Sequence, residues 1–174
     1  MKGLFMSVLA LGIMAGASAQ KTEHKDNLNS KTSWLKAGLS AGIPVGNTAQ
    51  YSSFAAGAVV NAQMMANPHL GVGLSTGYTH YFGKNGGSDF GAIPLGALIR
   101  YYSHEPGLLI GTDIGYSFTT NIAGSSGGLY VKPQLGWNNY DWNIYGFYNH
   151  VFANKGIGDL QHLGLAVTYN LRFD

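Results

Sequence analysis

Three charged residues are the first candidates for chemistry, because charges are scarce in this chain of 174 residues. Lysine, arginine, aspartate and glutamate make up 10% of it, against about 25% in a typical soluble domain. Arg100, Asp113 and Lys132 fall on the small-residue faces of three successive segments in which large apolar residues alternate with small or polar ones. If Ser103 pairs with Leu108 across the intervening turn, Arg100 lies diagonal to Asp113, within reach of a long side chain.

We therefore predict an interior network of Arg100, Asp113 and Lys132, with Lys132 opposite or diagonal to Asp113. A charge in a narrow interior costs several kcal/mol unless it is paired. The network could act as a gate or proton path, or it could be a structural plug of paired charges, and we favour the plug. Lys36 and Arg172 also fall on the small-residue faces of their own segments, so we expect them to point into the interior.

No other motif predicts a catalytic, metal or cofactor site. Gly38–Gly42 matches G-x-S-x-G but lies in the middle of an alternating segment, not on a strand–turn–helix elbow. The six histidines lack metal-ligand spacing, and the absence of cysteine excludes a disulfide scaffold and a thiol enzyme. The glycine-rich segments 83–89 and 124–128 lack the lysine and helix of a phosphate loop. We expect surface or interface histidines, and no enzyme.

The first 19 residues have the parts of a secretory signal peptide. Lys2 gives a basic start, residues 3–16 are almost wholly apolar, and Ala17-Ser18-Ala19 is a small-x-small cleavage site. A membrane anchor is disfavoured, because the apolar run is shorter than the ~20 residues that a helix needs to span a bilayer. Residues 20–32 are polar, and we expect a frayed periplasmic tail there.

Residues 33–174 alternate with period two in eight segments, which predicts β-strands. In the last segment Leu163, Leu165 and Val167 share one face, and Gly164 and Ala166 share the other. This pattern is typical of a barrel with apolar faces toward lipid and a narrow interior of small side chains. The barrel must close, because an open sheet edge in hydrocarbon leaves backbone groups unpaired. The predicted fold class is all-β, an eight-stranded antiparallel up-and-down transmembrane β-barrel.

Long and short connections alternate, which supports the up-and-down order and places the short turns and both termini on the periplasmic side. Aromatic residues cluster near the segment ends and predict two girdles at the membrane interfaces. The long-loop girdle comprises Tyr51, Phe54, Tyr78, Phe82, Phe90, Tyr116, Phe118, Tyr130, Tyr148 and Phe152, and the short-turn girdle comprises Trp34, Tyr101, Tyr102, Trp137, Trp142, Tyr169 and Phe173.

Residues 92–101 (AIPLGALIRY) and residues 162–169 (HLGLAVTY) resemble two segments of the small porin-like outer-membrane β-barrel proteins of Bacteroidota-type bacteria. Residues 92–101 (AIPLGALIRY) are similar to the family's "IPL…L.Y" strand, and a signal ending Ser18-Ala19-Gln20 is common there. Residues 162–169 (HLGLAVTY) are similar to the C-terminal β-signal, which implies recognition by the barrel-assembly machinery. Asp174 departs from the pattern, because family barrels usually end on the aromatic residue. The resemblance implies a bacterial outer-membrane location and says little about activity.

Three functions remain open. The first is a structural or interaction barrel, alone or as a subunit of a larger outer-membrane complex. The second is a narrow channel for small solutes, disfavoured because side chains fill an eight-stranded interior. The third is a lipid-modifying enzyme: His150–Asn154 is similar to the His-x-Ser-Asn strand of lipid A deacylases, but Phe152 replaces the serine. Scattered basic residues and a net charge of +2 exclude a nucleic-acid binder. Expected partners are outer-membrane lipid, the assembly machinery and a protein of the outer membrane.

Overall fold

The computed structural model describes residues 34–104, 106–153 and 158–171. The predicted signal peptide (1–19), the predicted polar tail (20–32) and the interior assignment of Arg172 lie outside these residues, as does the girdle residue Phe173. The only helix in the described ranges is short, and none is long and apolar enough to cross a membrane.

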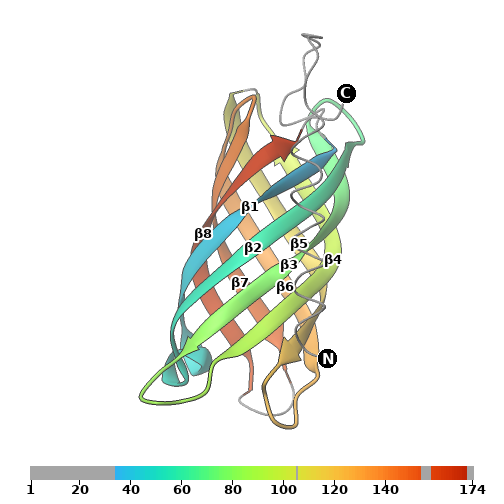
Figure 1. Ribbon diagram of the computed structural model, residues 1–174. Coiled ribbons are helices and arrows are strands. Elements are labelled where there is room, and N and C mark those ends of the chain that lie inside the picture. The colour runs from blue at the N-terminus through green and yellow to red at the C-terminus, as the bar shows by residue number, and fades with distance from the viewer. Residues whose placement is uncertain (1–33, 105, 154–157, 172–174) are drawn as a thin grey trace.

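Eight antiparallel strands follow one another around a closed barrel, which confirms the predicted all-β, eight-stranded antiparallel barrel and its up-and-down strand order (Figure 1). Strand β1, drawn blue, pairs with strand β8, drawn red, and completes the ring. The strands are β1 (Leu35–Pro44), β2 (Ser52–Met65), β3 (Leu70–Gly83), β4 (Phe90–Tyr102), β5 (Gly107–Thr120), β6 (Gly127–Asn138), β7 (Trp142–Phe152) and β8 (Leu160–Leu171).

The barrel wall has its apolar side chains on the outside. Leu39 is 71% exposed and Leu165 is 66% exposed, whereas Lys36, Arg100 and Asp113 are completely buried. Successive side chains of a strand point to opposite faces, so the period-two pattern of the sequence assigns each residue to the outer or the inner face. Because β1 pairs with β8, the closed sheet has no edge strand with unpaired backbone N–H and C=O groups.

Short turns join β2 to β3, β4 to β5 and β6 to β7, and asparagine caps fix two of them. Asn67 Oδ1 accepts hydrogen bonds from the N–H groups of His69 and Leu70 at 2.9 and 2.8 Å. Asn139 does the same for Asp141 and Trp142 at 3.0 and 2.8 Å. Such asparagine turns replace ladder bonds where the chain reverses.

The opposite end of the barrel carries the longer connections, as predicted from the sequence. A 3-10 helix, η1 (Gly46–Gln50), lies between β1 and β2, where the sequence indicated only a loop. Its Thr48 is completely buried and contacts the start of β8: Thr48 Oγ1 donates to the carbonyl oxygen of Asp159 at 3.2 Å and accepts from the N–H of Gln161. The helix therefore fastens the β1–β2 connection to β8.

Two prolines interrupt the strand ladders of the wall. Pairing of β3 with β4 is broken at Pro94, and pairing of β6 with β7 is broken at Pro133. Proline has no N–H to donate to a ladder. At the first break the hydroxyl of Thr76 donates to the Pro94 carbonyl at 2.9 Å, so a side chain supplies a cross-strand bond.

Candidate functional site

The barrel interior is divided into three zones along its axis. Near the long loops, seven side chains form an apolar layer: Ala55, Tyr81, Phe90, Ala92, Tyr130, Val151 and Leu160. Near the short turns, five more form a second layer: Tyr102, Leu109, Tyr145, Phe147 and Ala166. Asp113 and Lys132 are buried in a middle zone that touches both layers, because Lys132 lies against Phe147 of one layer and both residues line a cavity with Tyr130 of the other. Other buried polar side chains, such as Asn138 and Asn143, lie beside the short turns.

The strand register places the three predicted charges in this interior. Arg100 pairs with Gly111 on β5, so it lies diagonal to Asp113, as predicted. Asp113 pairs directly with Lys132 on β6. Arg100 and Asp113 are completely buried and Lys132 nearly so. Gly111 makes room for the arginine, because a Cβ there would lie 2.8 Å from Arg100 Cγ.

Two neutral side chains connect Arg100 to Asp113. With the Asn61 amide assigned so that its oxygen faces the guanidinium, Arg100 Nη2 donates to Asn61 Oδ1 at 3.1 Å and the amide nitrogen donates to Ser75 Oγ at 2.9 Å. Ser75 Oγ in turn donates to Asp113 Oδ2 at 2.9 Å. This chain of hydrogen bonds, which we call the Arg100–Asp113 relay, lets the two opposite charges stabilise each other without contact, because hydrogen bonds in a chain polarise one another.

The remaining contacts of the two cations are with polar and aromatic side chains. Arg100 Nε donates to Gln134 Oε1 at 3.2 Å, and its guanidinium carbon lies 4.9 Å from the ring centroid of Tyr145. Lys132 Nζ lies 4.3 Å from the ring centroid of Phe147. Both aromatic contacts are within the range of cation–π attraction, which is worth about 2 kcal/mol or more when the cation is desolvated.

The predicted network of paired charges is therefore wrong in one respect. Among the described residues, no direct ion pair joins Arg100, Asp113 and Lys132. The lysine side chain contacts Phe147 instead of Asp113, and the arginine reaches the aspartate only through the relay. Sequence reasoning missed Asn61, Ser75 and Gln134, although all three have the interior phase of their strands and are polar.

The predicted aromatic girdles also need a correction. Phe90, Tyr102 and Tyr130 are buried in the interior layers rather than placed on the outer surface. Gly96 admits one of these rings, because a Cβ there would lie 2.6 Å from the Tyr130 hydroxyl. Outward aromatic side chains do occur at both ends, among them Phe82, Phe118, Phe152, Trp137 and Trp142.

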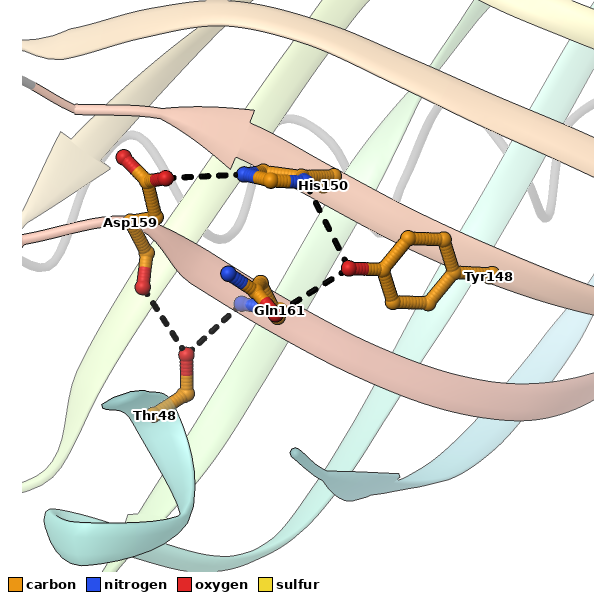
Figure 2. A network of polar contacts seen from close by, with 5 residues as sticks. All are labelled: Thr48, Tyr148, His150, Asp159 and Gln161. Atoms are coloured by element: carbon orange, nitrogen blue, oxygen red, sulfur yellow. Dashed lines mark hydrogen bonds and ion pairs between the residues drawn. The ribbon is translucent and has the colours of Figure 1, made fainter. Parts of the chain in front are cut away.

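A cluster of hydrogen-bonded polar side chains lies at the long-loop end of β7 and β8, on the outer face (Figure 2). His150 Nε2 donates to Asp159 Oδ2 at 2.9 Å, and His150 Nδ1 lies 3.4 Å from the Tyr148 hydroxyl. The Tyr148 hydroxyl donates to Gln161 Oε1 at 3.0 Å, and Thr48 completes the cluster through the backbone of Asp159 and Gln161. The Asp159–His150 pair links the two ends of the β7–β8 loop.

A second cluster of the same composition lies on β3 and the loop after it. His80 Nε2 donates to Asp89 Oδ2 at 3.1 Å, and His80 Nδ1 lies 3.3 Å from the Tyr78 hydroxyl. Asp89 Oδ1 also accepts from the N–H of Gly83 at 2.7 Å. That backbone hydrogen bond, followed by the one from His80, lowers the pKa of Asp89 below its usual value. Both clusters share the pattern Tyr-x-His-x-Phe with an aspartate nine residues after the histidine.

The motifs weighed as catalytic or metal sites in the sequence do not have the geometry that each would need. Ser40 of the G-x-S-x-G match lies within β1 rather than on an elbow. Groups of three or more histidine, aspartate, glutamate or cysteine side chains that could hold a metal are absent from the described ranges. Phe152 stacks on His150, with ring centroids 4.1 Å apart, where the deacylase-like pattern would need a serine.

No protein-family model matches this chain, and a search of the curated proteins finds no match.

Proposed function

We propose that this chain is an integral outer-membrane β-barrel of structural or interaction type, exported by its signal peptide. The observation that carries the proposal is the inverted distribution of side chains. Leu39, Leu129 and Leu165 are each at least 66% exposed, while the charged side chains of the middle zone are buried. Soluble monomers rarely expose a continuous apolar patch of more than a few hundred Å². Here exposed apolar side chains occur on all eight strands of the wall, and water would hydrate them at a large free-energy cost. Surrounding acyl chains would remove that cost.

The dimensions of the barrel support the same proposal. Strands of 10–14 residues form the wall, and a tilted transmembrane strand needs about 9–11 residues. Outward tryptophans lie beside the short turns, at Trp137 and Trp142, where amphipathic rings favour the interface between headgroups and acyl chains. The similarity of residues 92–101 and 162–169 to Bacteroidota-type barrels fits this location and insertion by the barrel-assembly machinery.

A charge scan of one strand tests the membrane location. Leu95 and Tyr101 are both exposed on the outer face of β4, the first in the middle of the strand and the second beside a short turn. We expect Leu95→Arg to destabilise the barrel in lipid vesicles by about 2–4 kcal/mol, and Tyr101→Arg by about 0–1 kcal/mol. Urea unfolding in vesicles measures both. Equal effects, or a native chain that stays soluble and monomeric without detergent, would overturn the proposal.

The two apolar layers favour a closed barrel over the alternative of a narrow channel. Tyr81 and Phe90 stack at a centroid distance of 4.8 Å in the layer near the long loops, and Tyr102 and Leu109 are completely buried in the other. We expect no stepwise conductance in planar bilayers. Stable single-channel currents from the purified chain would instead establish the channel.

A partner in the outer membrane is the remaining part of the proposal. We expect a pull-down from detergent-solubilised outer membrane to recover a companion protein in fixed ratio if the barrel is a subunit of a complex. Recovery of the chain alone would favour a barrel that acts by itself.

A further inference from the structure

A small cavity lies in the middle zone of the barrel interior, between Asp113 and the apolar layer near the long loops. The centre of a water molecule has about 20 Å³ of free space in it. Its polar lining includes Ser117, Tyr130, Lys132 and Asn149, and it extends to the wall beside the ladder break at Pro94. A single water molecule needs at least roughly 10–15 Å³ measured in the same way.

Two buried polar atoms on the lining residues have no hydrogen-bond partner in the protein. One is Asp113 Oδ1, a carboxylate oxygen that accepts hydrogen bonds; Ser75 donates to the other oxygen, Oδ2. The Tyr130 hydroxyl is a donor, and it too lacks a partner. Asp113 is completely buried and Tyr130 is 2% exposed, so a polar atom left unpaired on either residue destabilises the fold.

We propose that the cavity is a binding site for one long-lived water molecule, which donates to Asp113 Oδ1 and accepts from the Tyr130 hydroxyl. The ligand must donate to the free carboxylate oxygen, which excludes a simple anion, and a ligand that also accepts satisfies the Tyr130 O–H as a donor. A metal cation is excluded by charge: in the described interior Lys36, Arg100 and Lys132 already outnumber the single acid, Asp113. Neutral water meets both conditions.

With this water bound, both carboxylate oxygens of Asp113 accept a hydrogen bond, although Lys132 does not contact the carboxylate. The relay satisfies one carboxylate oxygen, and the bound water satisfies the other. The apolar layers at both ends slow the exchange of this water with solvent. The inference depends on the closed interior and not on the membrane location, so it can fail while the proposed function stands.

Oxygen-17 magnetic relaxation dispersion of the full chain in detergent micelles counts long-lived waters and tests the inference. Ser117→Val places two methyl groups at the cavity, where Ser117 is 1% exposed. Ser53→Val is the matched control at an exposed position of β2. We expect Ser117→Val to lose one long-lived water per molecule and Ser53→Val to lose none. An unchanged count in a folded Ser117→Val protein would overturn the inference.

High-resolution crystals of the unaltered chain give an independent answer if Ser117→Val does not fold. We expect one density peak within hydrogen-bond distance of both Asp113 Oδ1 and the Tyr130 hydroxyl, with no anomalous signal after a rubidium soak. A cavity without density, or a rubidium peak in it, would overturn the water assignment.

Discussion

The β3–β4 and β7–β8 hairpins carry the same Tyr-x-His-x-Phe pattern and the same aspartate, yet the two clusters are bound to the barrel differently. His150 and Asp159 have side chains 19% and 36% exposed, against 33% and 53% for His80 and Asp89. Among the described residues, Thr48 of η1 bonds directly to Asp159 and Gln161 of the β7–β8 cluster. The β3–β4 loop is bonded to the β1–β2 connection beside its cluster, through Lys84, which donates to the carbonyl oxygens of Tyr51 and Ala49. The same local pattern thus forms the same two side-chain contacts in both hairpins. We infer that its contribution to the free energy of unfolding depends on the residues packed around it.

The residue that faces the tyrosine explains part of the difference. In the β7–β8 hairpin Gln161 accepts a hydrogen bond from Tyr148. In the β3–β4 hairpin the corresponding residue is Gly91, and a Cβ there would lie 2.6 Å from the Tyr78 hydroxyl and 2.7 Å from its ring. The tyrosine ring thus covers an outward glycine, a contact that stabilises glycine positions in sheets.

Removing the Thr48 hydroxyl should lower the free energy of unfolding more than any other change proposed for the two hairpins. Thr48→Val leaves the Gln161 N–H without its acceptor at a buried position, and we expect a loss of about 1–3 kcal/mol in the free energy of unfolding. Amide hydrogen exchange should accelerate at the start of β8 and remain unchanged at the start of β4. Equal acceleration in both hairpins would show that η1 has no selective role.

The hydrogen bond between His150 and Asp159 in the β7–β8 cluster should contribute less to stability. Asp159→Asn removes the charge but keeps an oxygen for His150, and because the pair is partly exposed we expect a loss of about 0.5–1 kcal/mol in urea unfolding. Asp89→Asn is the matched variant in the more exposed cluster and should change the unfolding free energy less. The reverse order of the two variants would contradict the role assigned to burial.

Substitution of the covered glycine should have a smaller and local effect. Gly91→Ala must move the Tyr78 ring, which is the end of a flexible side chain, and separate its hydroxyl from His80. We expect a stability change within about 0.5 kcal/mol, as for most surface substitutions, together with changed NMR shifts of the His80 ring. Unchanged His80 shifts would show that Tyr78 does not depend on Gly91.

Acid should loosen the β3–β4 loop at a pH set by Asp89. Because the folded pKa of Asp89 is lowered, its contribution to stability is present above the usual aspartate pKa and is lost as the pH falls through the folded value. We expect the Gly83 amide to lose exchange protection across that range, after correction for intrinsic exchange. Asp89→Asn should lack this pH dependence, and its persistence there would exclude Asp89 as the cause.

The sequence predicted the strands, their order and the register of the three interior charges, because period-two alternation leaves little freedom in a closed barrel. It did not predict the relay, since whether Arg100 bonds to Asn61 or Asp113 depends on side-chain conformations that spacing does not determine. The girdle assignment failed for Phe90, Tyr102 and Tyr130 because it used their positions near strand ends and ignored their inward phase. The repeated histidine clusters were visible in the sequence, but only a comparison of the chain with itself would have found them.

The pairing of β1 with β8 also constrains when this molecule can form. Leu35 lies opposite Leu171, so the first and last strands of the described chain share a ladder of ten residue pairs. Strand β8 must therefore be synthesised before β1 can meet its second neighbour. Until then β1 and β8 each present an unpaired edge, and such edges are prone to aggregation.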